Sequence, residues 1–103
     1  MVESTGTAVG VVTVDNADVR VTTWTFERDG ADTGHHRHEF DYIVVPVTGG
    51  TFRVTNVDGT VRELAQEQAS SYLGRAGTEH NVVNASGGRA VFVEIELKRP
   101  SAG

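Results

Sequence analysis

Three of the four histidines of the chain lie within four consecutive positions, in the stretch GHHRHEFDY at residues 34–42. Imidazole is a common metal ligand, and because the chain has no cysteine, any metal must be held by nitrogen and oxygen atoms. Successive side chains of a β-strand point to opposite faces, with a rise of about 3.3 Å per residue, so His36 and His38 share one face. His35 and Arg37 then point to the other. The stretch is either a metal-binding device or a solvated, histidine-rich loop.

Two imidazoles do not complete a metal site, and His80 is the one remaining histidine that can supply a third ligand. It opens the predicted strand HNVVN, after the turn residue Gly77. If this strand lies beside the one that carries His36 and His38, the three side chains can bind one metal. We assign the fourth coordination position first to water, with Tyr42 and Asp41 as alternatives. Asp41 reaches the site only if a β-bulge reverses the direction of its side chain.

Tyr42 and Glu94 are the candidate catalytic residues, because a phenol and a carboxylate can transfer protons beside a metal. An unbroken strand places Tyr42 on the same face as His38. Glu94 alternates with apolar residues in VEIEL, so it faces either solvent or, as a base, the interior. Arg37 either binds the carboxylate of a ligand or pairs with its acidic neighbours on the outer face.

The elements that must position these residues are short β-strands. Seven segments alternate in the manner of strands and are rich in β-branched and aromatic residues. They cover residues 9–14, 19–26, 42–47, 51–57, 60–64, 80–83 and 90–97. Asp58-Gly59, between two of these segments, predicts a hairpin with a two-residue turn whose central residues both have positive φ. Only residues 62–69, RELAQEQA, have a composition that allows a helical turn.

This pattern predicts an all-β sandwich or barrel. At 103 residues the chain fits a single domain, which we expect to span residues 1–103. Its core is expected at about residues 9–98, with frayed tails at 1–8 and 99–103.

Composition and charge favour a small-molecule partner. The formal net charge is −5, and Lys98-Arg99 is the only adjacent pair of basic residues, which argues against a nucleic-acid partner. No apolar run approaches the roughly 20 residues that cross a bilayer, so no membrane partner is expected. The N-terminus resembles no signal peptide, and we expect a cytoplasmic location. The segment YIVVPV at 42–47 is apolar on both faces, which predicts a homodimer that covers the second face.

Two short motifs resemble those of the cupin superfamily. The spacing of the first motif is matched by Gly30, His36, His38, Tyr42 and Gly49. The motif has glutamate at the position of Tyr42. The second motif is matched by Gly77, His80 and Asn84, and it begins with proline where this chain has Arg75. The resemblance covers about residues 17–98, and within the superfamily the chain resembles small proteins associated with β-alanine degradation.

The resemblance implies a double-stranded β-helix, or jelly roll, with a metal at the mouth of the barrel. The metal-binding histidines of the family correspond to His36, His38 and His80, whereas its carboxylate ligand has no counterpart because Tyr42 stands there. The expected cofactor is a divalent transition metal: Fe, Mn, Ni or Zn. The function expected is that of a metal-dependent enzyme, of oxygenase or isomerase type, acting on a small carboxylate or keto compound. The alternative is a non-catalytic cupin that binds or senses a small molecule or metal.

Overall fold

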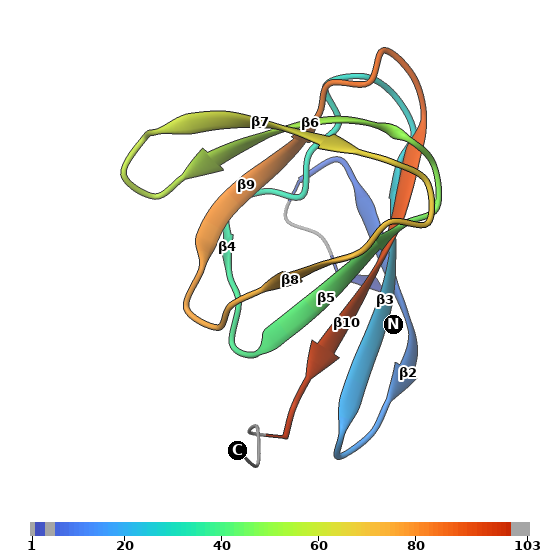
Figure 1. The fold of residues 1–103 in the computed structure, drawn as a ribbon, viewed down its shortest axis with the longest axis vertical. Helices are drawn as coiled ribbons and strands as arrows, with labels where there is room; N and C mark the ends of the chain where they lie inside the picture. The colour runs from blue at the N-terminus through green and yellow to red at the C-terminus, as the bar shows by residue number, and fades with distance from the viewer. Residues whose placement is uncertain (1, 4–5, 100–103) are drawn as a thin grey trace.

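The computed structural model describes residues 2–3 and 6–99, and within these ranges the chain forms ten β-strands and no helix (Figure 1). The strands are β1 (Val2–Glu3), β2 (Val9–Asp15), β3 (Val19–Phe26), β4 (His36–Arg37), β5 (Asp41–Pro46), β6 (Gly50–Asn56), β7 (Val61–Gln66), β8 (Tyr72–Gly74), β9 (Glu79–Asn84) and β10 (Ala90–Leu97). The described residues thus include no helix that is long and apolar enough to cross a membrane.

The strands form two antiparallel sheets that face each other around a barrel interior (Figure 1). One has the order β1-β2-β3-β10-β5-β8, and the other has the order β4-β9-β6-β7. Neighbours in space are often distant in sequence, as when β10 lies between β3 and β5. This arrangement is the predicted double-stranded β-helix, and the all-β prediction is confirmed.

Each of the seven segments predicted from residue alternation contains a strand. The helical turn suggested for residues 62–69 is wrong, because β7 occupies Val61–Gln66. Within β7, Leu64 and Gln66 are more buried than their neighbours, so the side chains alternate with the period of a strand. The predicted frayed tail 1–8 contains a strand as well, since Val2–Glu3 pair with β2. Residues 100–103 of the other predicted tail lie outside the described residues.

The hairpin predicted at Asp58-Gly59 joins β6 to β7, and its loop comprises residues 57–60. Gly59 has a φ of 87°, whereas Asp58 does not have the positive φ expected of it. Instead, the Asp58 carboxylate accepts a hydrogen bond from the Thr60 N–H at 2.9 Å, which closes the turn through a side chain. The hairpin brings β7 alongside β6 from Thr55 opposite Val61 onward.

Three phenylalanines from both sheets form the centre of the core. Phe26, Phe52 and Phe92 belong to β3, β6 and β10, and their ring centroids lie 5.1–5.6 Å apart in tilted and edge-on contacts. Phe26 and Phe52 are fully buried. Phe92 also lines the pocket that contains the histidines, so the core forms the apolar floor of that pocket.

Candidate metal centre

Pairing between β4 and β9 places two of the histidines side by side, with His36 directly opposite His80. His38 follows the end of β4, and two backbone hydrogen bonds fix its position. Its N–H donates to the carbonyl of Thr78 at 2.9 Å, and its carbonyl accepts from the N–H of Gly77 at 2.7 Å. The three histidines are therefore positioned by one strand pair and the turn that precedes β9.

The predicted division of faces is confirmed. His36 and His38 line the pocket, and His38 is only 4% exposed. His35 and Arg37 are exposed and do not line it. Although β4 itself ends at Arg37, the alternation of an extended chain continues through His38.

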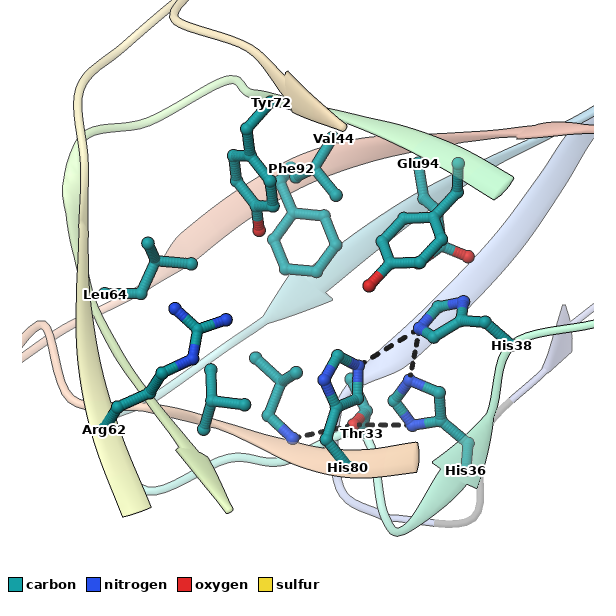
Figure 2. A pocket seen from close by; sticks show the side chains of 13 residues that line it. Thr33, His36, His38, Val44, Arg62, Leu64, Tyr72, His80, Phe92 and Glu94 are labelled. Carbon is teal, nitrogen blue, oxygen red and sulfur yellow. Dashed lines mark hydrogen bonds between the residues drawn. The ribbon is translucent and has the colours of Figure 1, made fainter. Parts of the chain in front are cut away.

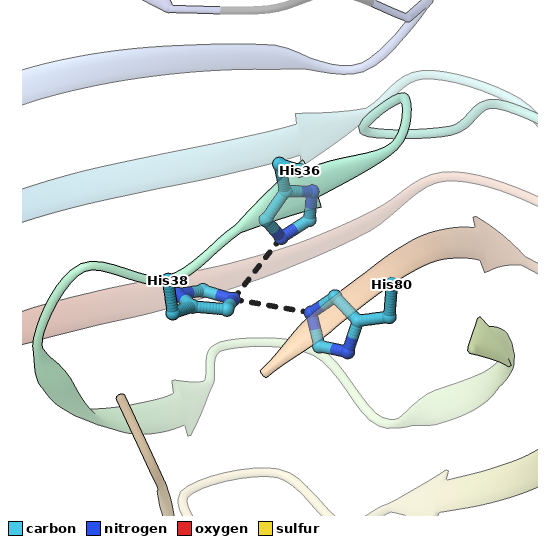
Figure 3. A group of neighbouring side chains, drawn as sticks. All are labelled: His36, His38 and His80. Carbon is cyan, nitrogen blue, oxygen red and sulfur yellow. Dashed lines mark hydrogen bonds between the residues drawn. The ribbon is translucent and has the colours of Figure 1, made fainter. Parts of the chain in front are cut away.

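The nitrogens of the three histidines that could bind a metal all lie within 4.8 Å of one another (Figure 3). The Nε2 atom of His38 lies 3.1 Å from that of His36 and 3.1 Å from that of His80. Nitrogens that share a metal at about 2.1 Å stand roughly 3.0 Å apart at right angles and roughly 3.4 Å apart at the tetrahedral angle. Both observed separations lie within that range.

Hydrogen bonding among neutral imidazoles does not explain these contacts. A neutral ring has one protonated nitrogen and one with a lone pair, so Nε2 of His38 can either donate or accept a single good hydrogen bond. It faces two Nε2 atoms, those of His36 and His80, at the same distance. One of the two contacts of His38 therefore has no proton between its nitrogens and cannot be a hydrogen bond. A bound cation, by contrast, would satisfy the lone pairs of all three nitrogens.

His36 has its other ring nitrogen tied to the backbone, which fixes the direction of its Nε2 lone pair. Its Nδ1 lies 2.9 Å from the carbonyl oxygen of Gly34, an acceptor only, so we assign the proton to Nδ1. The hydroxyl of Thr33 is also 3.3 Å from this nitrogen. A backbone carbonyl on the outer nitrogen of an imidazole is a common way to orient a metal-binding histidine.

Burial keeps the three imidazoles neutral. Burial first, and then the neighbouring histidines, lower the pKa of His38 to about 3 and that of His80 to about 4. Burial likewise lowers the pKa of His36 below its ordinary value of 6.5. At neutral pH the cluster therefore offers lone pairs rather than positive charges, which is the state in which imidazole binds metals.

Tyr42 packs directly on the cluster. Its ring is nearly parallel to that of His38, with centroids 3.8 Å apart and an interplanar angle of 17°. It also lies against Gly74, where an added Cβ would fall 2.0 Å from Cζ of the tyrosine. Burial, followed by the negative charge of Glu94, raises the pKa of Tyr42 to about 12, so the phenol stays protonated.

The same pocket contains the second residue predicted to transfer protons. Glu94 lines it from β10 (Figure 2), so the inward-facing alternative for this residue is the one observed. Asp41, considered as a fourth ligand, does not line it: its carboxylate accepts a hydrogen bond from the Ala76 N–H at 2.8 Å and pairs with Arg75. The structure thus brings together the predicted histidines, Tyr42 and Glu94 in one pocket, and leaves Asp41 outside it.

Three polar pocket residues were missed from the sequence: Thr33, Arg62 and Tyr72. Arg62 lies on β7, in a part of the chain predicted as a strand at residues 60–64 and as a possible helical turn at residues 62–69. In the strand, Arg62 shares a face with Leu64, which indicates that it also points inward, but it was not assigned to the site. Tyr72 belongs to the three-residue strand β8, which is too short to show a period.

The donor set fits a divalent transition metal. Three neutral nitrogens with converging lone pairs suit Fe, Mn, Ni or Zn, and the absence of cysteine excludes thiolate ligation. Three protein ligands also leave positions for water or a substrate. The residues His36, His38 and His80 can therefore hold one metal ion next to the pocket.

Comparisons with known proteins agree with this architecture. No family model matches the chain. Over 91 residues it is 50% identical to the β-alanine degradation protein BauB of Pseudomonas aeruginosa, covering 88% of this chain and 94% of that protein. Among solved structures, a cupin domain from Bordetella pertussis Tohama I is 40% identical with a TM-score of 0.85, covering 96% of this chain and 99% of that one.

A double-stranded β-helix protein of Klebsiella pneumoniae has a TM-score of 0.72 at 19% identity, over 92% of this chain and 80% of that one, and shows likeness of fold alone. The two closer similarities each span nearly the whole length of both chains. Together with the jelly-roll topology, they show that the chain belongs to the cupin superfamily.

Proposed function

We propose that the chain is a metal-dependent enzyme that acts on a small polar metabolite, a carboxylate or a keto compound. His36, His38 and His80 would hold the metal. The observation that supports this most strongly is the convergence of three Nε2 lone pairs beside a pocket that also contains proton-carrying side chains. A divalent transition metal supplies Lewis-acid or redox chemistry to a substrate bound next to it.

Two side chains are assigned to proton transfer. Glu94 is the proton acceptor, because it is the one carboxylate among the residues that line the pocket. Tyr42 is the proton donor, because it lines the pocket and its hydroxyl is protonated at neutral pH. A donor and an acceptor in one pocket support a reaction in which a proton is moved on the substrate, as an isomerase requires. An oxygenase-type reaction is the alternative chemistry for a redox-active metal.

The apolar floor limits the water around the reacting groups. Its side chains are Val44, Val54, Leu64, Val82 and Phe92. They come from both sheets, and all except Leu64 are buried. In such surroundings, charges on Glu94 and on a substrate interact more strongly than in bulk water.

The name of the Pseudomonas relative places that protein in β-alanine degradation. We extend this to a proposal that the present chain acts on a metabolite of the same kind. β-Alanine is a three-carbon amino acid with a terminal carboxylate, which agrees with the substrate class proposed above. The 50% identity over most of both chains supports the extension.

One observation favours the alternative of a non-catalytic binding protein. Tyr42 stands where the first cupin motif has a carboxylate, and a phenol with a pKa of about 12 is a weaker proton donor than an ordinary tyrosine. If Glu94 serves only to bind a ligand, the same pocket would capture a metabolite or metal without turnover.

The deciding experiment is metal analysis of protein purified without chelator or nickel resin, followed by aerobic and anaerobic substrate screening. We expect about one metal ion per chain, and turnover that Glu94→Gln abolishes while metal content stays unchanged. Protein that binds no metal under any loading condition would overturn the proposal. Full metal content with no turnover of any small carboxylate or keto compound would favour the binding protein.

A further inference from the structure

Arg62 is the only basic side chain other than the histidines among the residues that line the pocket. It lies near the start of β7, on the same face of the strand as Leu64 and the buried Gln66. Figure 2 shows its guanidinium directed into the pocket, on the side away from His36 and His38. Arg62 is itself an exposed residue, so its guanidinium is accessible from solvent and can pair with an anion that enters the pocket.

The ion pairs found among residues 6–99 do not include Arg62. Its charge nevertheless acts across the pocket. Burial is the main cause of the lowered pKa of His80 and of the raised pKa of Tyr42; the charge of Arg62 adds to the first shift and opposes the second. The guanidinium is therefore within electrostatic reach of the metal centre and has hydrogen-bond donors to offer a ligand.

Tyr72 supplies a second donor next to Arg62. Its hydroxyl oxygen accepts a hydrogen bond from the side-chain amide of Gln66 at 3.1 Å, which leaves the hydroxyl proton to be donated elsewhere. Figure 2 shows the hydroxyl pointing into the pocket on the same side as Arg62. Burial raises the pKa of this phenol, so it remains a donor at neutral pH.

We propose that Arg62 and Tyr72 form a subsite for the carboxylate of a small anionic ligand whose other end meets the three histidines. This proposal rests on the proposed metal-dependent function and specifies its substrate as an anion with two functional ends. A guanidinium pairs well with a carboxylate because its N–H groups match the two oxygens. The phenol adds a third hydrogen bond from a separate strand.

The size of the pocket restricts the ligand further. The cavity measures about 30 Å³, which is roughly the space of two waters when one needs 10–15 Å³. Because Arg62 and Tyr72 are exposed, a ligand of a few carbons would extend from this small space near the histidines toward their side chains. The expected occupant is therefore a carboxylate of a few carbons with a metal-binding group at the opposite end.

The test uses zinc-loaded protein and two hydroxamates, measured by isothermal titration calorimetry. The monohydroxamate of succinate has a metal-binding hydroxamate at one end and a carboxylate at the other. Propionohydroxamate has the same metal-binding group and a methyl group instead of the carboxylate. We expect the wild-type protein to bind the carboxylate probe at least about tenfold more tightly, the advantage typical of one charged hydrogen-bonded pair.

Arg62→Gln should remove this advantage, and Tyr72→Phe should reduce it. Arg53→Gln is the matched control, because Arg53 lies on the neighbouring strand β6, is exposed, and alternates with the buried Phe52 and Val54. This variant should keep the advantage in full. Zinc content should be the same in all four proteins.

Separate outcomes distinguish the subsite from the metal centre. If both probes bind but the carboxylate gives no advantage, or an advantage that survives Arg62→Gln, the subsite is overturned and the metal centre stands. If the advantage is unchanged in Tyr72→Phe, the phenol is not part of the subsite. If neither probe binds because the protein holds no zinc, the metal centre fails and the subsite fails with it.

Discussion

His36 lies directly opposite His80 in the pairing of β4 with β9, although β4 contains only two residues. The segment before β4 extends the contact, because the N–H of Thr33 donates to the carbonyl of Val82 at 3.0 Å. Farther along, Asp32 forms an isolated bridge with Val83. The segment that carries His36 thus pairs with β9 over a longer stretch than the two residues of β4. These contacts fix the spacing of the histidines before any ion binds.

The histidines should therefore be unequal in a pattern set by strand alternation. His36→Ala, His38→Ala and His80→Ala should each lose bound metal, since each removes one of three converging nitrogens. His35→Ala should retain metal near the wild-type level, because His35 is exposed and outside the cluster. Removing a ligand should lower the metal affinity by more than the roughly 10–100-fold that is typical when a residue supporting a ligand is changed. The measurement is metal per chain, with folding checked by circular dichroism.

Equal losses in His35→Ala and His36→Ala would indicate a flexible chelating loop instead of a rigid strand pair. Full metal content in His80→Ala would rule out the three-histidine site.

Much of this architecture follows from residue alternation alone. The valine- and threonine-rich segments locate seven strands, and alternation places His36 and His38 inward and His35 outward. Residue alternation does not show which strands lie next to each other in a sheet. The predicted site required the strand of His80 to lie beside the strand of His36. Alternation does not show this pairing; the family resemblance implies it, and the structure shows it as the pairing of β4 with β9.

The rest of the pocket depends on contacts between distant segments. Arg62 and Glu94 line one pocket only because β7 and β10, which belong to different sheets, face the same interior. The alternation of β10 does not decide which way Glu94 points, because this residue lies on the face opposite the apolar Val93 and Ile95. Asp41 is the converse case: it lies close in sequence to His38, but the hydrogen bond to Ala76 holds it away from the pocket.

The outer face of the six-stranded sheet supports the predicted homodimer. On β5, Tyr42 and Val44 are buried against the interior, whereas Ile43 and Val45 point outward and are half-buried. Across the pairing with β10, Ile43 is opposite Ile95 and Val45 is opposite Val93, which makes a continuous apolar surface. A surface of this kind is more stable when a second copy of the chain covers it.

We expect light scattering at micromolar concentration to give twice the 11.0 kDa mass of the chain. Val45→Glu should shift the mass to that of the monomer, because it places a charge in the middle of the proposed interface. Val61→Glu, at a position 55% exposed in the other sheet, should leave the dimer intact. A wild-type mass of 11.0 kDa under these conditions would contradict the prediction.

Gly74 should tolerate no side chain. A Cβ there would fall 2.0 Å from Cζ of Tyr42, and that ring is already stacked on His38. Gly74→Ala should lower the free energy of unfolding by about 1–3 kcal/mol, the usual cost of overpacking. Gly88→Ala is the control, because nothing lies within 4 Å of its added Cβ. Adding Tyr42→Leu to Gly74→Ala should recover part of the loss, and urea titrations of the four proteins measure it.

Acid should destabilise the metal-free protein before its carboxylates titrate. The pKa of His38 is about 3 and that of His80 about 4, whereas each returns to about 6.5 on unfolding. Between pH 6.5 and about 4 the unfolded chain therefore binds protons that the folded chain does not. Stability then falls as pH falls, by about 1.4 kcal/mol per pH unit for each excess proton bound. Carboxylates with lowered pKa values, such as Asp32, contribute only below pH 3.8.

Melting temperatures of chelator-treated protein, measured from pH 8 to pH 4, should stay level above about pH 6.5 and then decline. In His38→Gln the decline should be shallower, because one of the groups with a depressed pKa is removed. His35→Gln, which changes an exposed imidazole, should follow the wild-type curve. A melting temperature that rises on acidification would mean that the cluster gains protons on folding, and would contradict a cluster of buried neutral imidazoles.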